Sequence, residues 1–154
     1  MLYVDSSVLV KFYFQEIGSD AALIHVRAGN RPVATSLISF AEVHAAMARK
    51  YRERQISSAT LQRLRGQFDR DWAAFIEVVD VNNSSIAAVP SLVERFPLKA
   101  ADAIQLSSAL WLKDQLEAEI GPFKRATMEF TASDQALLEA ARQCGLQVFN
   151  PEEG

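Results

Sequence analysis

Four carboxylates stand out in the sequence because of the elements that they follow or interrupt: Asp5, Glu42, Asp102 and Asp134. If they converge in the fold, they repel one another unless some are protonated or a cation holds them. With one cysteine and two histidines, the chain offers no ligand set typical of zinc, whereas Mg²⁺ and Mn²⁺ prefer oxygen ligands. A cation held in this way lowers the pKa of a bound water and offsets charge on a phosphate, which is the chemistry of phosphodiester hydrolysis. The sequence alone does not show that the four side chains meet.

Three of these acids also have a purely structural explanation. Glu42 follows Ser39 by three residues, which is the spacing of a capping box at a helix start. Asp134 follows Ser133 at an expected helix start, where the helix dipole favours a negative side chain. Asp5 is also suited to capping the end of a strand. Taken one at a time, these positions leave structural and functional roles open.

Asp102 argues more strongly for function. It is the only charged residue in the apolar stretch 100–112, and helical spacing places Leu106, Ala109 and Lys113 on its face. A carboxylate on a mostly apolar stripe is costly unless it is paired or bound to a cation. We therefore favour a functional role for Asp102.

The elements expected around these acids alternate between short apolar strands and helices. This pattern predicts a parallel sheet that is covered by helices on both faces, with functional sites at the carboxyl ends of the strands. Asp5 and Asp134 both follow expected strands, and Pro90 should end or bend the helix that contains it. The expected strands are 2–5, 32–35, 76–79, 128–131 and 147–149, and the expected helices are 19–28, 37–52, 57–75, 83–96, 99–120 and 133–144. The expected helix caps are Ser19 for 19–28 and Ser57 or Ser58 for 57–75, and the expected stops are Gly29 and Gly121-Pro122.

The bulk properties limit the class of protein. The chain has 154 residues, 49% hydrophobic and 23% charged, which suits one globular domain over residues 1–154. A net charge of -3 argues against a protein that coats nucleic acid through bulk positive charge, but not against an enzyme that acts on it. The single cysteine, Cys144, excludes an intrachain disulfide. Because the N-terminus lacks signal-peptide features and no stretch is long and apolar enough to span a bilayer, we expect a soluble cytoplasmic protein.

Four segments of the chain resemble the PIN domain, and within it the VapC-type toxins, over essentially the whole length. They are 3–11 (YVDSSVLVK), 39–43 (SFAEV), 98–106 (LKAADAIQL) and 130–134 (FTASD). Each segment is a weak match alone, but four in this order form a specific signal. The resemblance implies a three-layer α/β/α sandwich around a parallel sheet, and endonucleolytic cleavage of RNA that depends on Mg²⁺ or Mn²⁺.

The resemblance also implies a role for each site residue. The implied catalytic residues and metal ligands are Asp5, Glu42, Asp102 and Asp134. The first three would form one metal site, and Asp134 would bind a second metal or orient water. Ser6 and Thr131 match positions where the family often has a hydroxyl that supports the acids; ordinary strand-end polarity is the alternative.

The family further implies two protein partners, a cognate antitoxin and a second copy of the chain in a homodimer. The apolar faces of the expected helices 37–52 and 57–75 suit either an antitoxin helix or the core. For the RNA substrate, Lys11, Arg49 and Lys99 are predicted phosphate contacts, and a solvated, ion-paired helix face is the alternative for Arg49.

The sequence disfavours two other functions. A non-catalytic PIN-like module that binds RNA or protein is disfavoured because all four acids are present. A phosphohydrolase of another α/β family is also disfavoured, because a haloacid-dehalogenase-type phosphatase would have a second Asp where this chain has Ser7.

Overall fold

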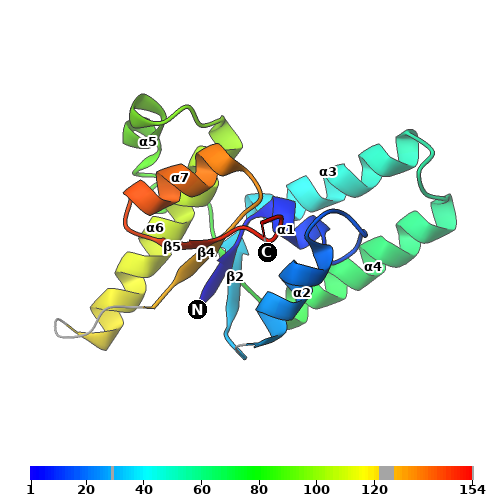
Figure 1. Cartoon of the computed structure of the whole chain (residues 1–154), viewed down its shortest axis with the longest axis horizontal. Helices are drawn as coiled ribbons and strands as arrows, with labels where there is room; N and C mark the ends of the chain where they lie inside the picture. Colours follow the sequence, from blue (N-terminus) through cyan, green and yellow to red (C-terminus); the bar gives the residue numbers. More distant parts are fainter. Residues whose placement is uncertain (29, 122–126, 154) are drawn as a thin grey trace.

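A five-stranded sheet forms the centre of the protein. The computed structural model describes residues 1–28, 30–121 and 127–153. Neighbouring strands are parallel throughout, in the order β3-β2-β1-β4-β5 (Figure 1). The strands are β1 (Leu2–Val4), β2 (Val33–Ser36), β3 (Ile76–Val79), β4 (Glu129–Thr131) and β5 (Gln147–Phe149). The predicted parallel sheet is confirmed.

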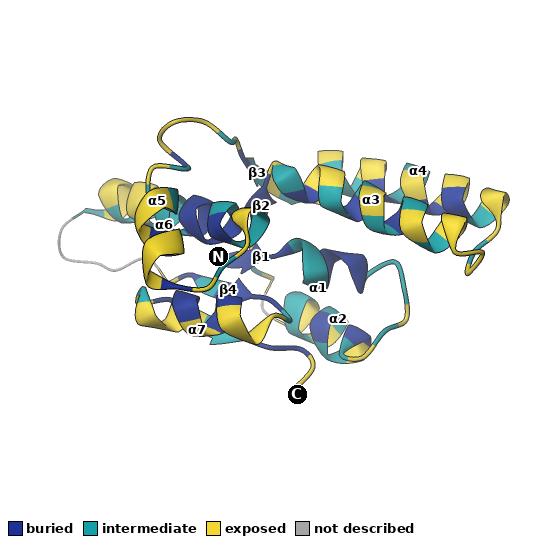
Figure 2. Ribbon diagram, turned by 90° about the horizontal axis from the view of Figure 1, so that it is seen from above, coloured by how far each residue is buried: buried dark blue, intermediate teal, exposed yellow. Residues whose placement is uncertain are grey.

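Helices cover both faces of this sheet and give the predicted three layers (Figure 2). Because successive side chains of a strand point to opposite faces, Leu2 and Val4 of β1 pack into one apolar cluster and Tyr3 into another. The first cluster is completed by α1 (Ser6–Val10), α2 (Ser19–Ala28), α3 (Ile38–Arg52) and α4 (Ser58–Phe75). The second is completed by α5 (Val89–Arg95), α6 (Ala100–Ile120) and α7 (Gln135–Gln143).

The apolar faces of α3 and α4 belong to the core. Val43 and Met47 of α3 are fully buried, and Phe68 of α4 packs in the same cluster. The two helices lie side by side and extend together away from the sheet (Figure 1). Of the two uses that the sequence left open for these faces, the structure supports core packing.

Two elements differ from the sequence-based expectation. Residues 6–10 form the short helix α1, with Asp5 as its N-cap, and five residues are too few for a helical period to be visible in the sequence. The helix expected over 83–96 begins only at Val89, and Pro90 lies in its first turn, where its missing N–H costs no intrahelical hydrogen bond. Pro90 therefore helps to start a helix, and the expected bend within a longer helix is wrong.

Several helix ends follow the predicted signals. Ser57 caps α4 by accepting a hydrogen bond from the backbone N of Thr60 at 3.1 Å. Gly121 ends α6 with a positive φ of 85°. Ser19 is not an N-cap but the first residue of α2, and its hydroxyl donates to the carbonyl of Phe14 in the preceding turn. Two further predicted stop residues, Gly29 and Pro122, lie outside the described residues. Among the helices that the structure describes, none combines the length and apolar character needed to cross a bilayer.

Candidate active site

Asp5 lies at the carboxyl edge of the sheet, directly after the central strand β1. Its backbone N donates to the carbonyl of Thr131 at the end of β4 (2.9 Å), and its carboxylate accepts from the backbone N of Ser7 (3.0 Å). The side chain therefore caps helix α1, a structural role that differs from the strand cap suggested by the sequence. Only 5% of Asp5 is exposed, and within the described residues its carboxylate has no salt-bridge partner. Burial of an unpaired carboxylate is costly.

The pKa of Asp5 shows that other acids lie nearby. Burial raises this pKa to about 6; the Ser7 hydrogen bonds oppose the rise, and the charges of Glu42 and Asp102 add to it. Glu42 and Asp102 thus lie close enough to Asp5 for their charges to disfavour its ionised form. Such a cluster is electrostatically incomplete without a cation.

Glu42 reaches the site from the first turns of α3. The capping box suggested by its spacing from Ser39 does not form, because α3 has no side-chain cap and Ser39 is fully buried. The Glu42 carboxylate instead accepts a hydrogen bond from the side-chain Nε2 of Gln105, on α6, at 3.1 Å. The local structural explanation for Glu42 is therefore wrong, and a long-range contact takes its place.

Asp102 and Asp134 form the other side of the site. Asp102 lies in the first turn of α6, and its pKa is raised by partial burial and then by the charge of Asp134, while Lys99 acts in the opposite direction. Asp134 is exposed and caps α7 by accepting from the backbone N of Leu137 at 2.9 Å. For Asp134 the capping role is thus confirmed, and its charge is also felt by Asp102.

Two hydroxyl residues predicted to support the acids are also at this edge. Thr131 is 1% exposed, and its Oγ1 has no hydrogen-bond partner among the described atoms, although its carbonyl accepts from Asp5. Ser6 follows Asp5 and lines an adjacent cleft. An unpaired buried hydroxyl next to an acid cluster is the kind of group that a bound ion or its water would satisfy.

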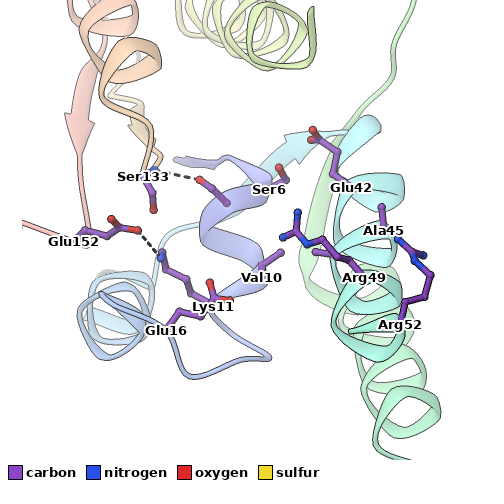
Figure 3. A pocket seen from close by; sticks show the side chains of 12 residues that line it. Ser6, Val10, Lys11, Glu16, Glu42, Ala45, Arg49, Arg52, Ser133 and Glu152 are labelled. Carbon is purple, nitrogen blue, oxygen red and sulfur yellow. Dashed lines mark hydrogen bonds and ion pairs between the residues drawn. The ribbon is translucent and has the colours of Figure 1, made fainter. Parts of the chain in front are cut away.

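A cleft with a volume of about 580 Å³ opens beside the acids, between α1 and α3 (Figure 3). Glu42 lies at one end of it, and the side chain of Arg49 extends from α3 toward α1. The cleft is lined by Ser6, Ser7, Val10, Lys11, Glu16, Glu42, Ala45, Ala46, Arg49, Arg52, Ser133 and Glu152. It therefore presents both acidic and basic groups.

The predicted RNA contacts differ in how available they are. Arg49 and Lys99 are exposed. Lys11 is 5% exposed, and its Nζ donates to the carbonyl of Ile17 and to Glu152 Oε1, each at 2.8 Å. The Lys11–Glu152 pair is visible at the edge of the cleft (Figure 3). The role of Lys11 as an RNA contact stays a prediction, since its charge already has two partners.

The donor set suits a hard divalent cation in charge and in chemistry. Asp5, Glu42 and Asp102 offer only oxygen ligands, and their mutual repulsion is what such a cation would remove. Within residues 1–28, 30–121 and 127–153, however, no three His, Cys, Asp or Glu side chains stand close enough together to hold a metal ion. The acids are thus neighbours rather than a closed ligand shell.

Sequence reasoning assigned no role to Gln105 or Glu152. Gln105 interrupts the apolar stretch 100–112 three residues after Asp102, and this polar interruption was its only signal. Glu152 has no local signal, because its partner Lys11 is 141 residues away in the sequence.

Comparisons with known proteins agree with this architecture. A family model described as the PIN domain matches residues 2–116. A comparison with curated proteins gave no match. Similar solved structures include VapBC2 from Rickettsia felis bound to a promoter DNA fragment (14% identity, 97% of this chain and 98% of that chain, TM-score 0.63).

Two more solved structures have a similar fold. A toxin–antitoxin complex from Klebsiella pneumoniae is 20% identical over 98% of both chains, with a TM-score of 0.60. The FitAcB structure from Neisseria gonorrhoeae is 18% identical over 98% of both chains, with a TM-score of 0.64. These likenesses concern the fold.

Proposed function

The chain belongs to the PIN domain family, and from that premise we propose that it is a metal-dependent endoribonuclease, the toxin of a toxin–antitoxin pair. The observation that carries the proposal is that Asp5, Glu42 and Asp102 lie near one another at the carboxyl edge of the sheet, where burial, and then the charges of Glu42 and Asp102, raise the pKa of Asp5. A buried acid with further acids beside it and an open cleft nearby is typical of catalytic sites.

In the proposed mechanism, Asp5, Glu42 and Asp102 would hold Mg²⁺ or Mn²⁺, and Asp134 would hold a second ion or orient a water. When bound, the cation supplies an activated water and offsets charge on the scissile phosphate. Thr131, whose buried hydroxyl has no hydrogen-bond partner among the described residues, and Ser6, which lines the cleft, would support the acids.

The cationic side chains would place the substrate. Arg49 extends into the cleft and Lys99 flanks Asp102, so both are suited to neutralising RNA phosphates on either side of the acids. Such contacts fix the path of the strand without reading its sequence. Lys11 would join them only if Glu152 moved away.

We also propose a cognate antitoxin and a homodimer. The similar structures from Rickettsia felis and Klebsiella pneumoniae are described as VapBC2 and as a toxin–antitoxin complex, which is the support for a protein inhibitor here. The cleft combines apolar Val10 and Ala46 with acidic Glu42, so it would suit a segment with apolar residues and one basic side chain.

The test is cleavage of RNA by the purified protein with Mg²⁺ or Mn²⁺, with and without EDTA. We expect cleavage that EDTA abolishes and that Asp5→Asn and Asp102→Asn reduce by at least about a hundredfold. Asp114→Asn is the matched control, because this exposed carboxylate lies on the same helix as Asp102 but far along it. Cleavage that survives chelation rejects the metal mechanism.

The two competing functions give different results in the same assay. A non-catalytic module would bind RNA without cutting it, and the Asp5→Asn and Asp102→Asn variants would leave that binding intact. A general phosphohydrolase would release phosphate from a small phosphomonoester, which we expect this protein not to do.

A further inference from the structure

A chain of buried hydrogen bonds connects the sheet to Glu42. Its members are Tyr3 of β1, Thr35 of β2, Ser39 of α3 and Gln105 of α6, and each is at most 1% exposed. They come from four different elements, so the chain ties together the strands and both helix layers at the acidic edge. Buried polar groups of this kind are costly unless all their hydrogen bonds are made.

The Gln105 amide is the branch point of this chain. One side-chain atom, Nε2, lies 3.1 Å from Glu42 Oε2 and 2.8 Å from Ser39 Oγ. A carboxylate accepts and does not donate, so the amide must present its NH₂ group to Glu42, and this group has two hydrogens for two acceptors. The other amide atom, Oε1, accepts from the hydroxyl of Tyr3 at 3.0 Å.

The direction of the remaining bonds follows from this orientation. Ser39 accepts from Gln105, so its own hydroxyl hydrogen is free for Thr35 Oγ1 at 2.7 Å. Thr35 in turn donates to the carbonyl of Val4 at 2.6 Å. Val4 directly precedes Asp5, so the chain runs from the backbone beside one proposed metal ligand to the carboxylate of another.

We propose that Gln105 is a positioning residue that orients the Glu42 carboxylate toward Asp5 and Asp102 for the divalent cation. The inference rests on the proposed function and deepens it. Gln105 occupies one oxygen of Glu42 and leaves Oε1 of that carboxylate available. The Glu42 carboxylate fixes which way the amide faces, because the reversed amide would set an oxygen against it, and the Tyr3 hydroxyl holds the amide in place by donating to its Oε1.

The alternative is that Gln105 only satisfies the buried hydroxyl of Tyr3. In that case its loss would lower the stability of the fold without changing how the acids bind a cation. Helix α6 provides a matched control for this distinction. Ser107 is 2% exposed and donates to the carbonyl of Ser85 at 2.7 Å, a buried hydrogen bond that does not lead to the acids.

The experiment compares wild type with Gln105→Met, Tyr3→Phe and Ser107→Ala. Methionine preserves the length of the side chain and removes both amide groups. The measurements are the Kd for Mn²⁺ by titration calorimetry, the melting temperature of the metal-free protein, and kcat and KM for RNA cleavage.

We expect Gln105→Met to raise the Kd for Mn²⁺ by about tenfold or more, the usual effect of removing a hydrogen bond to a metal ligand. The value of kcat should fall by a similar factor, with KM for RNA changed less than about twofold because the cationic contacts remain. Tyr3→Phe should shift the Kd in the same direction by a smaller factor. Ser107→Ala should lower the melting temperature and leave the Kd within about twofold of wild type.

A Kd for Mn²⁺ within about twofold of wild type in Gln105→Met overturns the proposal, as does an equal loss of Mn²⁺ affinity in Ser107→Ala. If Gln105→Met does not fold, Tyr3→Phe decides, and an unchanged Kd in that variant overturns the proposal. A wild-type protein that binds Mn²⁺ but cleaves no RNA rejects the proposed function, while the comparison of Mn²⁺ affinities still decides the role of Gln105.

Discussion

Replacing Asp5 with asparagine should stabilise the metal-free protein at neutral pH. The carboxyl is 5% exposed, and burial, together with the charges of Glu42 and Asp102, raises its pKa from 3.8 to about 6. Between these two values the folded protein binds more protons than the unfolded chain does. The contribution of Asp5 to stability is therefore complete at low pH, is lost as the pH rises through this window, and stays lost above it.

The magnitude follows from the two pKa values. A rise from 3.8 to about 6 corresponds to a loss of up to about 3 kcal/mol near pH 7.5, and to about 1 kcal/mol near pH 4.5. Asparagine matches the shape of aspartate and is an equally good N-cap, so it keeps an acceptor for the backbone N of Ser7. Asp5→Asn should therefore gain up to about 3 kcal/mol over wild type near pH 7.5 and about 1 kcal/mol near pH 4.5.

Urea unfolding followed by circular dichroism in EDTA measures this difference at the two pH values. Asp114→Asn removes an exposed carboxylate from α6 and serves as the control, with little expected change at either pH. Saturating Mn²⁺ should reverse the order, because it stabilises only a protein that binds it. A metal-free Asp5→Asn variant that is less stable than wild type near pH 7.5, or equally stabilised at both pH values, refutes the idea that Asp5 carries an unrelieved charge.

Three further predictions concern the surroundings of the site. Glu152→Gln should lower the free energy of unfolding by about 1–3 kcal/mol, because the buried Lys11 ammonium loses its carboxylate partner and keeps the neutral carbonyl of Ile17; no change in urea unfolding would mean that the pair contributes nothing. Gly18→Ala should destabilise the fold by at least about 2 kcal/mol, since φ at this position is 81° and a Cβ would lie 2.6 Å from a backbone oxygen of the C-terminal segment. Gly66→Ala, within α4, should instead stabilise the fold by about 0.5–1 kcal/mol. Equal melting temperatures for the two variants would contradict this prediction. Arg49→Ala should raise KM for RNA with kcat within about twofold of wild type, and a loss in kcat alone would place this side chain in the chemistry instead.

The sheet and most helices could be predicted because their signals are local. The run Ile76–Val79 is rich in β-branched residues and ends before the polar Asp80, and strand Gln147–Phe149 follows a glycine that ends a helix. Parallel strands then share one carboxyl edge, where the structure places the residue after β1 beside the end of β4, a strand order that the sequence did not predict. The position of Asp5 at the edge that carries the site follows from these local patterns.

The contacts within the site could not be predicted, because they depend on partners from distant parts of the chain. The spacing of Ser39 and Glu42 is that of a capping box, yet Gln105, 63 residues beyond Glu42, donates to both. Lys11 lies close in sequence to Asp5, but Glu152 takes its charge. A local sequence pattern indicates which hydrogen bonds and ion pairs a side chain is able to make. The packing of α6 and of the C-terminal segment determines which of them form.

The same edge of the sheet carries the catalytic proposal and the buried Asp5 carboxyl, whose raised pKa makes its charge destabilising at neutral pH. The loss of up to about 3 kcal/mol at Asp5 is large beside the roughly 5–15 kcal/mol that holds a typical domain together. The two apolar clusters on the faces of the sheet supply the burial that offsets such a loss. The buried polar residues Thr35, Ser39 and Gln105 are hydrogen-bonded to one another, and Gln105 also binds Glu42, so directional bonds fix orientation here. If this edge existed for stability, replacing its acids with neutral isosteres would weaken the metal-free protein; if it exists for a cation, the same replacements strengthen the protein and abolish its response to Mn²⁺.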